Sequence, residues 1–253
     1  MLFDIRVYDQ LNFCVPGCST NLLLPLRRTL VLQNTFEHDM YKEILSTGIN
    51  IVPMQKEHAT QLEALQRIVF PNLAEEELLH ANQYKKHVEL FPEGQFVALD
   101  GDTVIGATSS IRYHYDPNVY EHHSFFEIMG GGWFTTHEPT GEWLYGMDVS
   151  VHPDYRGKGV AKALYRARQQ TCRNLGLMGQ MTVGMLNGYD KVRNAMSIEV
   201  YYEKVKNHEL FDPTVSVQEK VGFKISGLMK DYLNDPTCGN AGAVIVLDAG
   251  KEI

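Results

Sequence analysis

The chain has 253 residues, of which 44% are hydrophobic, and its formal net charge is −8. This length and composition fill one main globular domain, well above the size at which core burial becomes marginal. The acidic balance argues against general nucleic-acid binding, which requires a basic surface, and it agrees with a cationic acceptor such as an amine.

The apolar run at residues 21–32 is the only candidate for a membrane or secretion signal near the N-terminus. Pro25, Arg27 and Arg28 interrupt it. It is therefore too short and too charged to span a bilayer, and it lacks the pattern of a secretory signal. We expect a cytoplasmic protein that does not bind membranes.

Cysteine and histidine spacing indicates neither a disulfide framework nor a metal site. The cysteines are Cys14, Cys18, Cys172 and Cys238. They include no CxxC pair, so we expect free thiols in a reducing compartment. Histidines 122, 123 and 137 lack the spacing partners of a metal site, so no bound metal is expected.

The first third of the chain begins with a segment of no clear period. Residues 1–48 are treated as an N-terminal extension, either a packing arm, a loosely ordered leader or a dimerisation arm. A short strand at 49–53 is followed by a helix with apolar residues at Ala59, Leu62, Leu65 and Val69. A second helix is predicted over 74–90, where the Phe91-Pro-Glu-Gly94 sequence ends it.

The middle of the chain has strand patterns on both sides of a long insertion. Residues 95–99 and 103–113 are predicted to form a hairpin joined by the Asp100-Gly-Asp turn. An insertion occupies residues 115–142. Tyr145, Met147, Val149 and Val151 then alternate with smaller or polar residues, which is strand periodicity, and Pro153 closes the strand.

The last third continues the alternation of helices and strands. Val160, Leu164, Ala167, Thr171 and Leu175 recur at helical spacing, and Gly176 provides the stop. Residues 181–185 are predicted to pair in parallel with the Val149 strand through this helix. A second insertion at 187–213 contains a helix at 197–206. A helix at 214–221 and strands at 223–232 and 241–248 complete the domain.

The turn between the Val149 strand and its helix is the most informative stretch. Gly157 and Gly159 let the backbone approach a ligand closely, and the helix start offers unpaired N–H groups, so a pyrophosphate would fit. Neither nucleotide motif is present: a P-loop needs GxxxxGK followed by Ser or Thr, and a dinucleotide fold needs GxGxxG. The sequence Arg156-Gly-Lys-Gly-Val-Ala161 instead matches Q/R-x-x-G-x-G/A. In this strand-to-helix context the chain resembles the GNAT superfamily of acyl-CoA N-acyltransferases.

The resemblance implies an α/β fold with a mixed central sheet of about six to seven strands flanked by helices. It covers residues 49–249, leaving 250–253 as a tail, and its specific part is 145–176. A narrower likeness is to the acyltransferase domain fused to nitrilase-type carbon–nitrogen hydrolases. It lies in Phe91-Pro-Glu-Gly-Gln95, the Glu127–His137 insertion, Asn187-Gly-Tyr-Asp190 and the 196–204 segment. No hydrolase Glu, Lys and Cys arrangement follows Asp248, so we expect the hydrolase part to be absent.

The family pattern also implies where an acyl-CoA, acetyl-CoA in the simplest case, would bind. Backbone groups of Val149 and Val151 would pair with the pantetheine arm. The pyrophosphate would contact the turn and the start of the helix, whose residues are Arg156, Gly157, Lys158, Gly159, Val160, Ala161 and Lys162. For Lys158 and Lys162, a solvated basic face is the alternative to direct phosphate contact.

Acyl transfer to an amine requires a base, because an amine with a pKa of about 10 is mostly protonated at neutral pH. Asp148 is the first candidate, since it precedes the pantetheine-binding residues on the central strand. A carboxylate held by local hydrogen bonds or a salt bridge is the alternative reading. Glu127 and His137 are second candidates, because the Gly130-Gly-Gly132 bend would let their loop fold over the acceptor, and so long a loop usually has a role.

The chain departs from the family at the leaving group. Many GNAT enzymes carry Tyr-Glu-Lys-x-Gly-Phe, in which the phenol protonates the departing thiolate, whereas this chain has Gln218-Glu-Lys-Val-Gly-Phe223. An amide is no general acid, so either another group supplies the proton or the thiolate leaves toward solvent. Tyr189, Tyr201 and Tyr202 could substitute, although tyrosines in such a helix more often pack.

The leading hypothesis is an N-acyltransferase, most simply an acetyltransferase, that acts on a small-molecule or protein amine in a ternary complex. A non-catalytic acyl-CoA sensor is the alternative, and a regulatory partner of a separate hydrolase is a third. Nucleic acid and membrane are not expected as partners, and a homodimer is left open.

Overall fold

The computed structural model describes residues 41–116 and 121–253, which belong to one compact unit. Most of the predicted N-terminal extension, with Cys14 and Cys18, lies outside the described residues. Cys172 and Cys238 are buried free thiols. Within the described ranges, no helix is long and apolar enough to cross a membrane.

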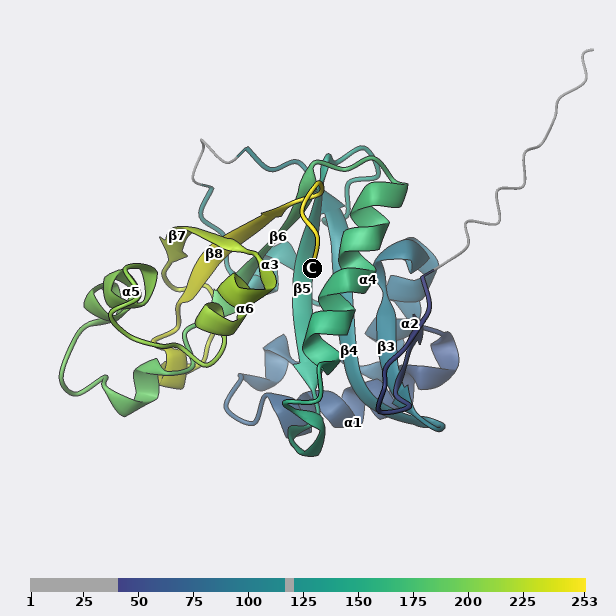
Figure 1. The fold of residues 1–253 in the computed structure, drawn as a ribbon, viewed down its shortest axis with the longest axis horizontal. Coiled ribbons are helices and arrows are strands. Elements are labelled where there is room, and N and C mark those ends of the chain that lie inside the picture. Colours follow the sequence, from purple (N-terminus) through teal and green to yellow (C-terminus); the bar gives the residue numbers. More distant parts are fainter. Residues whose placement is uncertain (1–40, 117–120) are drawn as a thin grey trace, which may run out of the picture. The chain divides into compact units, whose positions relative to one another are not determined.

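The core of the unit is a mixed eight-stranded sheet in the order β1-β2-β3-β4-β5-β6-β8-β7 (Figure 1). The strands are β1 Glu43–Ile44, β2 Asn50–Pro53, β3 Phe96–Asp100, β4 Thr103–Tyr113, β5 Trp143–Val151, β6 Gly179–Met185, β7 Lys224–Met229 and β8 Gly242–Asp248. Of these eight strands, β5 and β6 alone pair in parallel. The mixed sheet agrees with the prediction, and the additional strand is β1, a two-residue piece from the segment treated as an extension.

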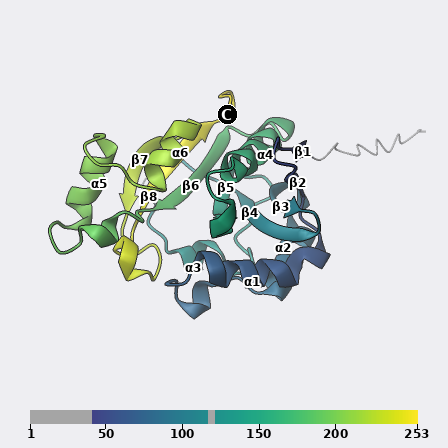
Figure 2. The same ribbon diagram turned by 60° about the horizontal axis from the view of Figure 1, so that its bottom comes forward.

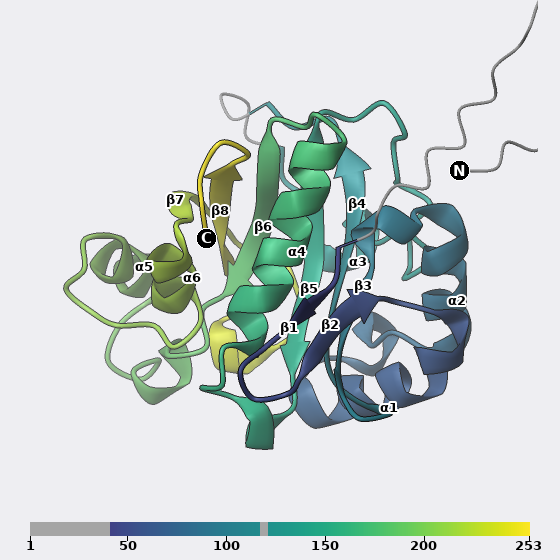
Figure 3. The ribbon, with the colours of Figure 1, turned by 45° about the vertical axis from the view of Figure 1, so that its right-hand side comes forward.

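Helices cover both faces of this sheet (Figures 2 and 3). They are α1 Ala59–Val69, α2 Ala81–Leu90, α3 Phe125–Ile128, α4 Val160–Asn174, α5 Ile198–Lys206 and α6 Val215–Val221. One apolar cluster joins α1 and α2 to residues such as Tyr145 and Met147 of β5. On the opposite face, α4 packs on β2 to β5 and α5 and α6 pack on β8. The central strand β5 therefore packs against α1 and α2 on one face of the sheet and against α4 on the other.

The helix predicted over 74–90 is shorter than expected. Its first part is a single 3-10 turn at Glu75–Glu77, followed by extended residues, and α2 begins only at Ala81. His80 is the extended N-cap, where its backbone N–H donates to Gln83 Oε1 at 2.7 Å, and the Ala81 N–H donates to Glu63 Oε2 at 2.9 Å. These caps stabilise a start at residue 81.

A β-bulge in β5 changes the predicted alternation. Asp148 pairs with Ser109, but Gly146 pairs with Ser110, so Met147 is an extra residue without a partner. The bulge reverses the phase of the side chains: Tyr145 and Met147 face α1, whereas Val149 and Val151 pack against α4. The four apolar residues thus do not share one face, and Asp148 is turned toward α1.

Gly146 of β5 lies against the side chain of Arg168 on α4. A Cβ atom added there would lie 1.4 Å from Nη2 of Arg168 on α4. The absence of a side chain at this position is therefore what makes room for the guanidinium.

We expect Gly146→Ala to lower the free energy of unfolding by about 1–3 kcal/mol, the usual cost of overpacking. In an Arg168→Met background the same change should cost less, because a methionine can move aside. Urea unfolding of the single and double variants measures the coupling. Strictly additive effects would contradict the close approach of these two residues.

Candidate functional site: a glycine turn and a fork in the sheet

The turn between β5 and α4 is open and lacks a capping side chain. Gly157 and Gly159 have φ values of 75° and 83°, and apart from the adjacent residues no heavy atom of the described chain lies within 4 Å of a Cβ added at either position. Gly159 is the N-cap of α4 and makes no side-chain cap. The first N–H groups of an α-helix have no intrahelical acceptor, so those of α4 face an open space suited to an anion.

Three cations surround this turn. Arg156 donates from Nε to the carbonyl oxygen of Val151 at 3.3 Å. Lys158 Nζ lies 4.5 Å from the ring centroid of Tyr155. Lys162 is exposed on the first turn of α4. The arrangement places positive charge beside the N-terminus of the helix, which itself carries partial positive charge.

Strands β5 and β6 form a fork that begins beyond Gly146. Their parallel pairing joins residues 143–146 to residues 179–182 and goes no further. The Asp148 carbonyl accepts a hydrogen bond from Thr108 Oγ1 of β4 at 2.7 Å. Because backbone groups of successive strand residues face alternate edges, those of Val149 and Val151 face the fork. An extended ligand can pair with them there.

Asp148 lies one residue beyond the bulge, on the α1 face of the fork. Its carboxylate accepts from the Ser109 backbone N–H at 2.8 Å and from Gln66 Nε2 of α1 at 3.1 Å. Burial raises the pKa of Asp148 from 3.8 to about 6, although these hydrogen bonds and the charge of Arg168 act in the opposite direction. At neutral pH the group is still mostly a carboxylate, with a pKa suited to accepting a proton.

The opposite face of the fork carries a second polar group, of which the sequence analysis singled out only Gln218. It comprises Tyr165 and Arg168 of α4 and Gln218 of α6. Gln218 Nε2 donates to the Tyr165 phenol oxygen at 2.8 Å, and the Arg168 guanidinium carbon lies 5.4 Å from the Tyr165 ring centroid. For Tyr165 and Arg168, the signal in the sequence was spacing, since Ala161, Tyr165 and Arg168 recur at helical intervals on one side of α4.

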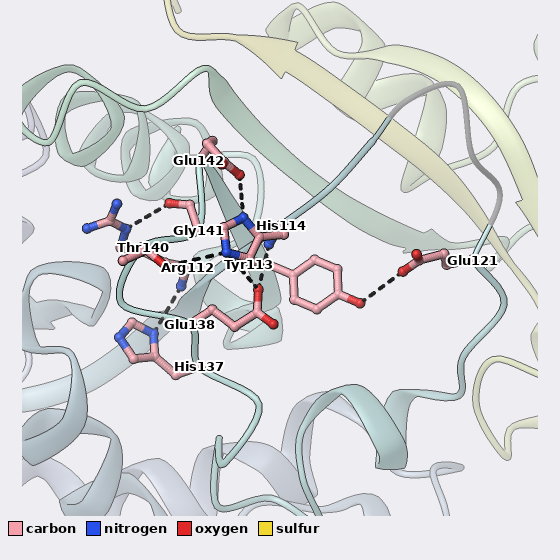
Figure 4. A network of polar contacts seen from close by, with 9 residues as sticks. All are labelled: Arg112, Tyr113, His114, Glu121, His137, Glu138, Thr140, Gly141 and Glu142. Carbon is pink, nitrogen blue, oxygen red and sulfur yellow. Dashed lines mark hydrogen bonds and ion pairs between the residues drawn. The ribbon is translucent and has the colours of Figure 1, made fainter.

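The insertion after β4 is fastened to the end of that strand (Figure 4). The Arg112 N–H donates to His137 Nδ1 at 3.1 Å, and its Nε donates to the Gly141 carbonyl at 2.9 Å. His114 bonds through Nδ1 to Glu142 Oε2 at 2.6 Å. His137 therefore anchors the loop, and this network does not include the carboxylate of Asp148.

Glu127 makes a local contact at the start of α3. Its Oε2 accepts from the Ser124 N–H at 2.8 Å and from the Ser124 hydroxyl at 2.9 Å, which forms a capping box. These bonds lower the pKa of the exposed Glu127 carboxyl. The structure thus gives Glu127 a capping contact and no hydrogen bond to the residues of the fork.

The three tyrosines considered as substitutes for Gln218 also have contacts of their own. Tyr201 donates to Asp212 Oδ2 at 3.0 Å, and Tyr189 donates to the Met196 carbonyl at 3.3 Å. Tyr202 is buried in the cluster around α5 and α6. The phenol that does contact Gln218 belongs to Tyr165, on another helix.

Metal binding has no support within the described ranges. No group of three or more His, Cys, Asp or Glu side chains there could hold a metal ion.

Comparison with known families identifies this arrangement. The family model described as acetyltransferase (GNAT) family matches residues 59–201, which is more than half of the chain and includes the turn and both arms of the fork. The chain belongs to the GNAT acetyltransferase family. The mixed sheet flanked by helices is the fold of this family.

Two proteins of Bacillus subtilis (strain 168) are similar to this GNAT protein in sequence. "Probable hydrolase YhcX" is 36% identical over 151 residues, which is 60% of this chain but only 29% of the length of that relative. "Uncharacterized N-acetyltransferase YkwB" is 28% identical over 217 residues, covering 85% of this chain and 94% of the relative.

Two solved structures share the fold of this GNAT protein. They are a GphF GNAT-like decarboxylase in complex with isobutyryl-CoA, at 20% identity and a TM-score of 0.66, and the loading GNATL domain of CurA from Lyngbya majuscula, at 21% and 0.67. Each alignment covers 79% of this chain and 98% of the solved one. At this identity the likeness concerns the fold alone.

The raised pKa of Asp148 has a consequence for stability. The folded chain binds this proton more tightly than the unfolded chain, so the associated stabilisation is complete below about pH 4 and is lost as the pH rises through about 6. Above that range the buried charge costs on the order of 3 kcal/mol, since the shift is about two units.

Asp148→Asn should therefore raise the free energy of unfolding at about pH 8, by on the order of 2–3 kcal/mol, and the gain should shrink toward pH 4. Denaturant unfolding at several pH values measures it. A gain that is the same at both ends of this range would show that burial does not shift this carboxyl.

Proposed function

We propose that this protein transfers an acyl group, most simply acetyl, from an acyl-CoA to an amine in a ternary complex. The observation that carries the proposal is the fork, which has an open glycine turn at its mouth and the buried carboxylate of Asp148 beside its base. Family membership supports acyl transfer. The acceptor is a small-molecule amine or a protein amine.

Cofactor binding would use the two parts of the site in sequence. The N–H groups from Gly157 to Lys162 would hold the pyrophosphate, with charge from Arg156, Lys158 and Lys162. The pantetheine arm would pair with backbone groups of Val149 and Val151 that face the fork, and at Val151 it would share the carbonyl with Arg156 Nε. Relatives in complex with acyl-CoA support this choice, since the GphF structure holds isobutyryl-CoA.

Asp148 would act as the base. An alkylamine with a pKa of about 10 is neutral in only about one molecule in a thousand at pH 7, so proton removal is a large part of the barrier. A carboxylate with a pKa of about 6 is ionised at this pH. It can take the proton directly or through one water. Glu127 is the weaker choice because Ser124 already occupies its carboxylate.

The likeness to acyltransferase domains fused to nitrilase-type hydrolases suggests how this chain relates to larger proteins. The part of this chain that matches YhcX corresponds to 29% of that protein, whose name is probable hydrolase. We take this chain to correspond to the acyltransferase part of such two-part proteins. We also propose a cytoplasmic location, with no nucleic acid or membrane as partner, and leave a homodimer open.

Isothermal titration with acetyl-CoA tests the cofactor. Gly159→Val should weaken binding at least tenfold, because a branched side chain would enter the phosphate path. Gly176→Val is the matched control: Gly176 also has a positive φ, 64°, and open space around it, but it ends α4 rather than begins it. Equal losses in both variants would mean that backbone strain, not the phosphate path, explains the effect. A wild-type protein that does not bind acetyl-CoA would refute the proposal.

Turnover across an amine panel tests the chemistry and separates an enzyme from a sensor. Asp148→Asn should lower kcat by on the order of 10²-fold near pH 7 and by less at alkaline pH, where more of the amine is already neutral. The affinity for acetyl-CoA should stay within about twofold, since the carboxylate does not contact the pyrophosphate. A large loss with Glu127→Gln instead would assign the base to Glu127. Binding without any acylated product would favour the sensor.

A further inference from the structure

Arg168 is the most completely buried cation in the described part of the chain. Its side chain has no exposed surface, and Nε, Nη1 and Nη2 all lack a hydrogen-bond partner there. An unpaired buried guanidinium costs several kcal/mol of stability. Burial lowers its pKa, yet a guanidinium stays protonated in proteins. A buried charge that lowers stability this much indicates a function for Arg168.

Two glycines, one on each arm of the fork, leave room for Arg168 and Gln218. Arg168 fills the space beside Gly146 of β5, and Gln218 fills the space beside Gly184 of β6, where an added Cβ would lie 2.3 Å from Gln218 Oε1. Tyr165 lies between them and accepts the bond from Gln218. The Oε1 atom of Gln218 has no partner among the described residues. The group is thus a set of unused donors and acceptors at the base of the fork.

The same stripe of α4 connects this group with the glycine turn. Ala161 is in the first turn of the helix, Tyr165 follows one turn later and Arg168 almost one turn after that, about 10 Å along the axis from Ala161. A chain-like ligand that is held at the turn and runs down the fork reaches Tyr165 and then Arg168. Its reactive end therefore arrives on the α4 face, whereas Asp148 faces α1.

We propose that Arg168 stabilises the thiolate of coenzyme A as it leaves, and that Tyr165 and Gln218 position this end of the cofactor. The inference rests on the proposed acyl transfer. The nitrogen of the acceptor forms its bond to the acyl carbon, Asp148 accepts the proton of that nitrogen, and the C–S bond breaks with its electron pair remaining on sulfur. The guanidinium stays protonated and pairs with the new thiolate, which later takes its proton from water.

The chemistry favours the guanidinium over the phenol as the leaving-group partner. A free thiol has a pKa of about 8.5 and a phenol one of about 10, so proton transfer from a tyrosine to a thiolate is unfavourable. Burial raises the pKa of Tyr165 still further. A fixed cation requires no proton transfer and acts where negative charge develops. Arg168 would thus replace the tyrosine that many GNAT enzymes carry at the position of Gln218.

Three titratable groups interact electrostatically with Arg168. They are Tyr165 and Cys172 on its own helix and Asp148 on β5. Burial raises the pKa of the Cys172 thiol to about 12, so it is neutral and gives no counter-charge. No ion pair of Arg168 within 4 Å occurs in residues 41–116 and 121–253. An added thiolate would be the closest anion.

The test uses the product, so it needs no knowledge of the acceptor. The affinities of CoA and of desulfo-CoA, which lacks the sulfur, are measured by calorimetry between about pH 6.5 and pH 9.5. If Arg168 lowers the thiol pKa by about one unit, the preference for CoA over desulfo-CoA rises about tenfold across this range. The comparison cancels titrations that do not involve the sulfur.

Arg168→Met should abolish this rise, while acetyl-CoA affinity and the fold are kept, and removal of an unpaired buried charge should leave the unfolding midpoint equal or higher. Arg168→Gln is the second variant if methionine perturbs folding. Arg166→Met is the matched control, because Arg166 lies on the same helix but pairs with Glu43 away from the fork; it should keep the rise.

The outcomes separate the two proposals. The role of Arg168 is overturned if the wild-type preference for CoA over desulfo-CoA does not change with pH. It is also overturned if the rise in this preference persists in both Arg168 variants. Either result leaves the proposed acyl transfer intact. A wild-type protein that binds neither CoA nor acetyl-CoA overturns the proposed function itself.

Discussion

The separation of β5 from β6 beyond Gly146 is the constraint on which the rest of this structure depends. Two parallel strands that stop pairing leave backbone donors and acceptors without partners inside a sheet, which is costly unless a ligand pairs with them. The bulge at Met147 directly follows the last paired residue, Gly146, and shifts the side-chain alternation of the following residues by one position. The interruption thus both opens a binding slot and sets which face each side chain reaches.

The two faces of the fork have opposite electrostatic character. On the α1 side, Asp148 is a buried carboxylate that two donors hold in place. On the α4 side, Arg168 is a buried cation without a hydrogen-bond acceptor among the described residues. A proton acceptor and a cation on opposite sides of one slot suit a reaction that removes a proton from one reactant and leaves negative charge on the other. The fold would be more stable with apolar residues in place of these two buried charges. Buried charges of this kind are typical of a functional site.

Much of the fold follows from local sequence patterns. The turn at Arg156–Ala161, the hairpin around Gly101 and the helices that begin at Ala59, Val160 and Ile198 agree with prediction because apolar spacing, glycines and caps act over a few residues. The helix at 74–90 was predicted too long because its true cap depends on Glu63, a residue from another helix. The roles of individual site residues stay predictions in the absence of a bound ligand.

The sequence by itself determined the family turn, the strand before it and the helix after it, since these depend on residue types at fixed short spacings. Only the tertiary structure decided that Asp148 faces α1, because a single bulge reverses the alternation that the sequence suggests. It also brought Tyr165, Arg168 and Gln218 together from two helices. Contacts of this kind depend on how helices lie across a sheet, and no periodicity within one segment encodes that.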